Sequence, residues 1–124
     1  MLAPTCHNVL SQLLHHLRRH DAGAIQAVLR AARPAEAASA LRAFDSWHRA
    51  LFLELAPPAA AAAIFRELPL RHQAEVLRQI EAPGCAAILA RLERDERQLA
   101  LSLVNDRSRE RIRRFLPAEA ELAS

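Results

Sequence analysis

The amino-acid sequence predicts an all-α protein, a stacked superhelix of about nine or ten short helices with a 12-residue repeat. From residue 21 onwards the chain divides into eight windows of twelve residues without a gap. The eighth, ninth and twelfth places of these windows are apolar at 23 of 24 positions, where a composition of 52% hydrophobic residues would give about half. Strand signals such as alternating β-branched residues are absent. A face that recurs at this period indicates one helix and one turn per window.

The windows open on residue types that start helices. These openings are Asp21, Arg33, Asp45, Pro57, Pro69, Glu81, Glu93 and Asn105. Asp and Asn side chains cap helix N-termini, and proline suits the first turn, where a backbone N–H has no intrahelical partner. Six of the seven prolines fall at or just after an opening or at the close of the last window, and none lies in the middle of a window.

The segment from Pro57 to Leu68 shows the repeating unit most clearly. Pro57 and Pro58 suit its first turn, and a further proline follows Leu68 and ends the helix. Ile64, Phe65 and Leu68 share one face of a 3.6-residue helix. Because a helix this short is not stable alone in water, it must pack against its neighbours in sequence.

The two ends of the chain depart from the repeat. Residues 1–20 are expected to form an N-terminal capping helix with Asn8 as its N-cap, residues 21–116 the helical repeat domain, and residues 117–124 a C-terminal tail. At 124 residues the chain is expected to be a single domain. The alternative is a compact all-α domain in which the 12-residue period is an accident of a composition rich in Ala and Leu.

Composition restricts the class of protein. No run of eighteen apolar residues occurs, so no membrane span is predicted. His15, His16 and Arg18 interrupt the most apolar part of the N-terminus, which argues against a signal peptide and predicts a cytoplasmic protein. Cys6 and Cys85 are far apart and are expected to be reduced thiols. With two glycines, the chain has no Gly-rich phosphate loop, and no small-molecule substrate is predicted.

Several helical segments carry a family resemblance. They read Ala62-Ala-Ile-Phe-Arg-Glu-Leu-Pro69, Glu75-Val-Leu-Arg-Gln-Ile-Glu81 and Ala86-Ala-Ile-Leu-Ala-Arg-Leu92. Such tandem short helices resemble the cytoplasmic N-terminal domain of MgtE-type magnesium transporters, here as a stand-alone domain. The resemblance implies a right-handed superhelix, a fold similar to the middle domain of the flagellar motor switch protein FliG, and acidic residues that help bind magnesium and gate a channel. By itself such a domain has no transport activity.

Only two window openings resemble the acidic turns of that family. They read Glu93-Arg-Asp-Glu96 and Asn105-Asp106. Asp95, Glu96 and Asp106 are therefore the candidate magnesium ligands, since this ion prefers hard oxygen ligands. The alternative is that Asp95 and Glu96 favour a helix N-terminus through the macrodipole, with Arg94 and Arg97 neutralising them. No cofactor is predicted, and weak magnesium binding is left open.

The last window carries a basic patch. Arg107, Arg111 and Arg114 share a helical face and are the candidate residues for binding phosphate or an acidic partner surface. The apolar residues of this window are expected to turn inwards: Ile112, Phe115 and Leu116. The alternative is a solvated C-terminal face favoured by the helix dipole. A nucleic-acid partner is disfavoured, because no exposed aromatic residues alternate with the arginines.

Catalysis is not predicted from the residue types present. His16 and His20 have a spacing that can hold a metal, but the sequence shows no third ligand, so solvated or capping histidines are favoured. No Ser or Cys lies in a nucleophile motif, and tyrosine is absent. The sequence thus predicts that the protein is not an enzyme.

Three functions remain as hypotheses. The first is a non-enzymatic cytoplasmic interaction or regulatory domain that acts on another protein or associates with itself. The second is a divalent-cation sensor that responds to magnesium. The third is a nucleic-acid binder that uses the arginines of residues 107–114.

Overall fold

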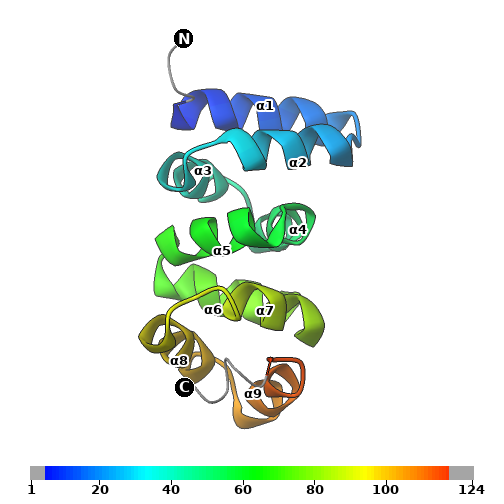
Figure 1. The fold of residues 1–124 in the computed structure, drawn as a ribbon. Helices are drawn as coiled ribbons and strands as arrows, with labels where there is room; N and C mark the ends of the chain where they lie inside the picture. The colour runs from blue at the N-terminus through cyan, green and yellow to red at the C-terminus, as the bar shows by residue number, and fades with distance from the viewer. Residues whose placement is uncertain (1–4, 118–124) are drawn as a thin grey trace.

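The structure, a computed structural model, describes residues 5–117, and all regular secondary structure in this part of the chain is helical. Figure 1 shows the helices stacked from the N-terminus to the C-terminus. The nine helices within the described residues are α1 (Cys6–Arg18), α2 (Ala22–Ala31), α3 (Pro34–Leu41), α4 (Ser46–Leu55), α5 (Pro58–Glu67), α6 (Leu70–Gln79), α7 (Ala82–Leu89), α8 (Arg94–Ser102) and α9 (Asp106–Arg113). The predicted all-α class and number of helices are confirmed.

Helices α2 to α9 begin twelve residues apart, and their N-cap residues are the eight predicted window openings. The side chains of Asp21, Asp45 and Asn105 each accept the backbone N–H three residues further on, at 3.0, 2.8 and 2.8 Å. Glu93 and Glu96 form a capping box at the start of α8. The helix starts at these openings are therefore set by local chemistry.

The first helix starts earlier than predicted. Its N-cap is Thr5, whose hydroxyl accepts the N–H of Asn8 at 3.2 Å, so the expectation that Asn8 is the N-cap is wrong. The hydroxyl oxygen of Thr5 can accept a backbone N–H as the amide oxygen of an asparagine does, but Thr5 lies about one turn before Asn8. At the other end, His20 has the left-handed conformation, with φ 52°, and closes α1 with the two backbone hydrogen bonds of a Schellman motif.

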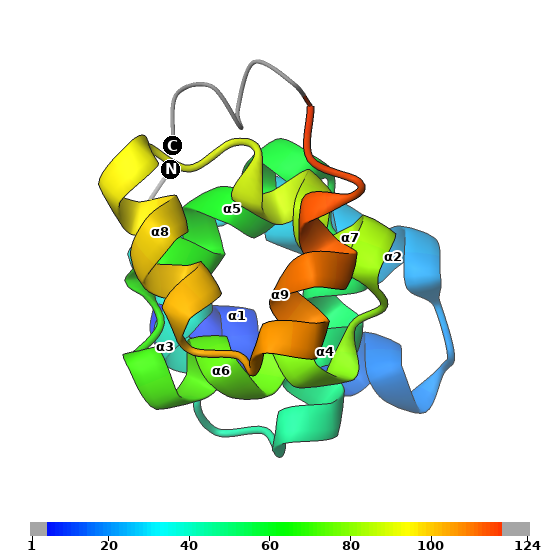
Figure 2. The ribbon, with the colours of Figure 1, turned by 90° about the horizontal axis from the view of Figure 1, so that it is seen from below.

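Each helix packs on the helix two places further along the chain. Helices α1, α3, α5, α7 and α9 form one such series, and α2, α4, α6 and α8 form the other. Viewed along the stack, the helices lie around a common axis (Figure 2). Residues about 24 positions apart in sequence are therefore neighbours in space, a relation that a single helix cannot provide.

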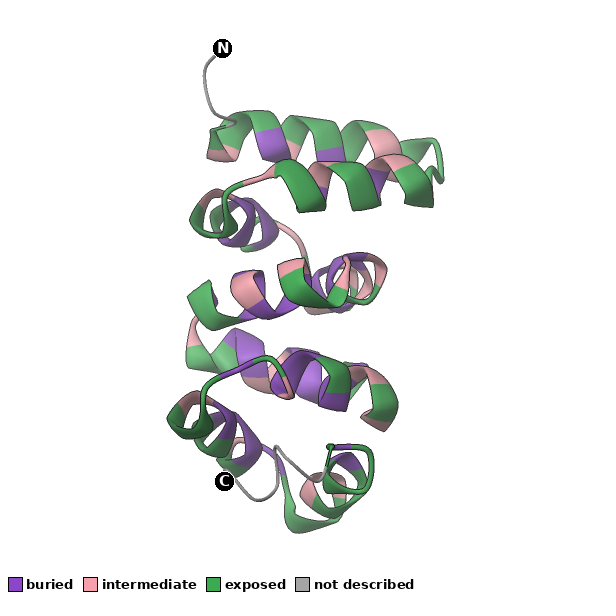
Figure 3. Ribbon diagram, in the orientation of Figure 1, coloured by how far each residue is buried: buried purple, intermediate pink, exposed green. Residues whose placement is uncertain are grey.

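The repeated apolar places form the core. Of the 24 eighth, ninth and twelfth places, 20 are buried, Val28, Ala32 and Phe44 are half-buried, and Arg113 is exposed. Phe52 and Phe65 are the largest fully buried side chains. Figure 3 shows the buried residues on the faces that the helices turn towards one another.

The prediction that Phe115 turns inwards is wrong. Ile112 and Leu116 are buried, but the Phe115 side chain is 55% exposed. Phe115 lies after the end of α9, where the chain has left the helical geometry that placed it on the apolar face. The outer surface of the last repeat therefore carries an aromatic side chain.

Two expectations about the architecture stay predictions. The first is the right-handed sense of the superhelix. The second is the division into a capping helix, a repeat domain and a tail at residues 1–20, 21–116 and 117–124, of which residues 1–4 and 118–124 lie outside the described part. Within that part, α1 packs against both α2 and α3 and covers the first end of the stack.

Candidate functional site

The fifth place of each window is a buried position that the hydrophobic pattern did not mark. Its residues are Ile25, Ala37, Arg49, Ala61, Gln73, Cys85, Arg97 and Arg109. All are buried except the last, which is half-buried. Five of them carry a hydrogen-bond donor, and we name these five the capping row: Arg49, Gln73, Cys85, Arg97 and Arg109.

Members of the capping row bind the end of the preceding helix. Gln73 Nε2 donates to the backbone oxygens of Phe65 and Leu68, at 2.9 and 3.2 Å. Those acceptors lie eight and five residues before the donor, and the same two spacings recur in other windows. They recur for Arg49 with Leu41 and Phe44, for the Cys85 thiol with Leu77 and Ile80, and for Arg109 with Leu101 and Val104. Arg97 Nη1 donates to the oxygen of Leu92 at 2.8 Å.

The capping row supplies hydrogen-bond donors to the ends of short helices. The last carbonyl groups of a helix have no intrahelical N–H partner, and leaving them unpaired in a buried place costs free energy. In a stack of short helices such ends are frequent and lie close to the core. A donor from the next helix satisfies them. The sequence signal that could have revealed this row is that the fifth place never holds a carboxylate.

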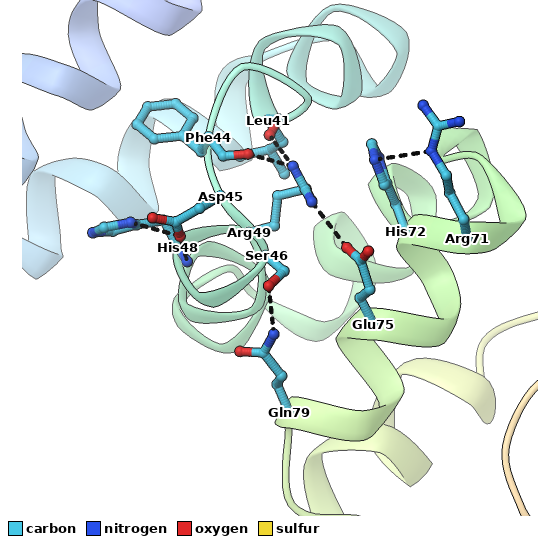
Figure 4. Close-up of polar contacts among 10 residues, drawn as sticks. All are labelled: Leu41, Phe44, Asp45, Ser46, His48, Arg49, Arg71, His72, Glu75 and Gln79. Carbon is cyan, nitrogen blue, oxygen red and sulfur yellow. Dashed lines mark hydrogen bonds and ion pairs between the residues drawn. The ribbon is translucent and has the colours of Figure 1, made fainter.

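Arg49 combines its capping contacts with an ion pair to another helix (Figure 4). Its guanidinium donates to the Leu41 and Phe44 oxygens and forms an ion pair with Glu75 of α6, with 2.9 Å between Nη2 and Oε2. The Arg49 side chain is 7% exposed and that of Glu75 is 31% exposed. Gln79 also reaches across from α6 and donates to the hydroxyl of Ser46 at 2.7 Å. These contacts tie α4 to α6.

The predicted acidic residues lie on two different helix starts. Asp95 and Glu96 are in the first turn of α8, and Asp106 is in the first turn of α9. Glu96 Oε2 pairs with Arg66 Nε at 3.2 Å, and Asp106 Oδ1 pairs with Arg109 Nη1 at 2.7 Å. Residues 5–117 contain no group of three or more His, Cys, Asp or Glu side chains that could hold a metal ion. The structure thus does not gather the three acids, and their magnesium role stays a prediction.

The predicted basic residues, by contrast, do lie together. Arg107, Arg111 and Arg114 are exposed and line one surface hollow on α9, together with Asp106 and Glu110. None of the ion pairs found within the described residues involves these three arginines. We name them the arginine face.

A comparison with known protein families decides the relationship of the chain. The family described as MgtE intracellular N domain matches residues 32–123, which is most of the 124-residue sequence. The chain belongs to this family. No curated protein matches the chain. In the described part of this MgtE N domain, no helix is long and apolar enough to cross a lipid bilayer.

This MgtE N domain buries one histidine. His72, on α6, is 8% exposed, and its Nδ1 has no hydrogen-bond partner among the described residues. Burial lowers the pKa of His72, and the nearby positive charge of Arg49 lowers it further. Its Nε2 accepts a long contact from Arg71 Nε at 3.5 Å. His72 is therefore a neutral side chain of the core and not a proton donor at a surface site.

The cysteines of the domain and its N-terminal histidine pair do not form a reactive or metal-binding site in the described residues. Cys6 and Cys85 are both free thiols, as expected. Burial raises the pKa of Cys85 to about 12, so this thiol is protonated at neutral pH and is a poor nucleophile. His16 and His20 belong to no group of three metal-ligating side chains within residues 5–117. The buried thiol instead serves as a donor of the capping row.

Proposed function

We propose that this chain is a non-enzymatic interaction module that works in the cytoplasm, as a domain without transport activity by itself. Membership of the MgtE intracellular N domain family supports this role, because that domain is a non-catalytic helical part of a transporter. The partner is an acidic surface, either of another protein or of a second copy of this chain. No cofactor takes part in this function.

The single observation that carries the proposal is the arginine face. Arg49, Arg66 and Arg109 each pair with a carboxylate of the chain itself. The three side chains of the arginine face have no such ion pair within the described residues, and they line one hollow at α9. Helix α9 lies at the C-terminal end of the stack (Figure 1). Exposed guanidinium groups that line one hollow suit bidentate binding of carboxylates.

Reversing the charge of the arginine face is expected to abolish partner binding in cells. A photo-crosslinking residue in place of the exposed Glu110 should give a discrete cross-linked product, identified by mass spectrometry as a partner protein or as the chain itself. The triple variant Arg107→Glu, Arg111→Glu and Arg114→Glu should remove this product by like-charge repulsion. Because all three residues are exposed, the fold should persist, and a circular dichroism melt will check this.

The matched control reverses three other exposed arginines, Arg30, Arg33 and Arg42, and changes the net charge by the same amount. It should leave the cross-linked product unchanged. Equal loss in both triple variants would show a general effect of charge and contradict the proposal. Salt-dependent binding of the purified chain to generic duplex DNA, lost only with the arginine face, would instead assign that face to nucleic acid.

The cation-sensing alternative makes a different prediction. Because Glu96 and Asp106 already pair with arginines, and the net charge is +3, there is little carboxylate repulsion for magnesium to relieve. Millimolar magnesium is therefore expected to change the melting temperature no more than sodium chloride of matching ionic strength. A magnesium-specific rise of several degrees in the melting temperature, abolished by Asp95→Asn or Glu96→Gln, would favour the cation-sensor hypothesis instead.

A further inference from the structure

Surface hollows recur at the same place in three successive repeats. Each lies between one helix and the helix two places along, for the pairs α5 and α7, α6 and α8, and α7 and α9. Leu53, Phe65 and Leu77, which are twelve residues apart, line the three hollows in turn. Their volumes are about 610, 180 and 440 Å³. We name the largest of them the α5–α7 hollow.

The capping row is interrupted at the α5–α7 hollow. Ala61 has the place that Gln73 fills in the next window, but its side chain has no donor. By the spacing of the row, a donor here would serve the backbone oxygens of Leu53 and Ala56. No side chain within residues 5–117 forms a hydrogen bond to either oxygen. The Leu53 oxygen also lacks the usual donor four residues on, because Pro57 has no N–H. Ala61, Leu53 and Ala56 all line the hollow.

Small side chains line the hollow on α7. Gly84 and Ala87 line it opposite Ala61. The corresponding places of the α6–α8 hollow, twelve residues on, are filled by Glu96 and Leu99. The α5–α7 hollow is larger than the α6–α8 hollow, and it coincides with the break in the capping row.

The charges around the hollow are all negative. Glu54 and Glu81 line it, and no Arg or His does, although the chain as a whole has a net charge of +3. The negative charge of Glu54 also affects a core residue. Burial raises the pKa of Cys85, and the charge of Glu54 raises it further. The remaining wall is mostly apolar and includes Ile80 and Ile88.

We propose that the α5–α7 hollow binds a guanidinium group carried on a short apolar stem. In three other windows the capping side chain is itself an arginine, and Arg49 and Arg109 each show how a guanidinium satisfies two carbonyl oxygens at this place. The ligand would donate to the oxygens of Leu53 and Ala56, with Glu54 and Glu81 balancing its charge. This inference does not rest on the arginine face, which is on α9.

Agmatine, a guanidinium on a four-carbon amine, is the probe that tests the site in the full chain. Titration followed by amide NMR should shift the signals of Ala61 and Gly84, with half-saturation at about 1 mM. Ala61→Gln supplies the donor that Gln73 supplies in the next window. It should weaken agmatine binding about tenfold or more and raise the melting temperature. Ala59→Gln, an exposed change on the same helix, should do neither.

A second pair of variants leaves the core untouched. Glu54→Gln and Glu81→Gln, both at exposed positions, should each weaken agmatine binding at least about threefold. Glu67→Gln, an exposed carboxylate of α5 outside the hollow, should have no effect. Unchanged affinity in Ala61→Gln and in both hollow variants would overturn the proposal.

Two further ligands identify the source of the guanidinium. Putrescine keeps the stem and the positive charge but has no guanidinium, and binding as tight as that of agmatine would overturn the assigned chemistry. The blocked tripeptide Gly-Arg-Gly presents the group as an arginine side chain. Tighter binding of the peptide than of agmatine would assign the site to an arginine of a protein, and the reverse order to a small guanidino compound.

Discussion

Replacing Phe65 with alanine is expected to lower the free energy of unfolding by about 3–5 kcal/mol. Phe65 occupies the ninth place of its window, is fully buried, and is among the largest side chains of the core. Truncation removes apolar contacts and leaves a cavity that the short helices around it can close only in part. Urea denaturation followed by circular dichroism measures the loss, with an unchanged slope as evidence that the transition is the same.

The matched control for this change is Phe115→Ala. Phe115 has the same side chain but is 55% exposed, so its loss should cost no more than about 0.5 kcal/mol. Leu89→Ala, at the ninth place two windows after Phe65, should cost about 2–5 kcal/mol. A loss below about 1 kcal/mol at both Phe65 and Leu89 would mean that the repeated apolar face is not the core.

Replacing Arg49 with methionine should destabilise the fold by about 3 kcal/mol or more. Methionine keeps the apolar stem of the side chain, so the main loss is the guanidinium. Its removal leaves the Leu41 and Phe44 oxygens without a side-chain donor and the Glu75 carboxylate without its counter-charge. Thermal and urea denaturation at neutral pH measure this effect.

Arg66→Met provides the comparison for Arg49. Arg66 also pairs with a carboxylate, that of Glu96, but both side chains are about 40% exposed, so its loss should cost less than about 1 kcal/mol. Adding Glu75→Gln to the Arg49 variant should return part of the stability, because it removes the uncompensated charge. Equal losses for Arg49→Met and Arg66→Met would contradict the role given to burial and carbonyl capping.

The helix starts could be predicted from sequence because the chemistry that sets them is local. The Asp45 side chain accepts the backbone N–H of a residue only three positions further on. The ring of Pro57 restricts its own backbone angle φ, whatever the tertiary structure. The apolar face of Ile64 and Phe65 likewise follows from helical period alone. Local signals compete at the first helix, whose N-cap is Thr5 although Asn8 is a residue of equally suitable type.

The candidate site was predictable only in part. The arginine face lies within a single helix and its cap residue, so the spacing of Arg107, Arg111 and Arg114 placed them together correctly. The ion-pair partner of Glu96 could not be predicted from the sequence. The sequence suggested the adjacent Arg94 and Arg97, whereas the structure pairs Glu96 with Arg66, thirty residues away. Arg66 lies near the end of α5 and Glu96 in the first turn of α8, so the two side chains meet only after the helices have stacked.

The sequence by itself determined the all-α class, the starts of α2 to α9 and the apolar stripe, because these depend on neighbours within one turn or one window. Tertiary structure alone decided which polar side chains are buried and which groups they bind. A donor of the capping row and its acceptors belong to consecutive helices, and Arg49 and Glu75 to helices two places apart. These groups meet only after the chain has turned and stacked, so the hydrophobic pattern does not show which donor meets which acceptor. The α5–α7 hollow also exists only in the folded chain, because the residues that line it come from the segments α4 to α7.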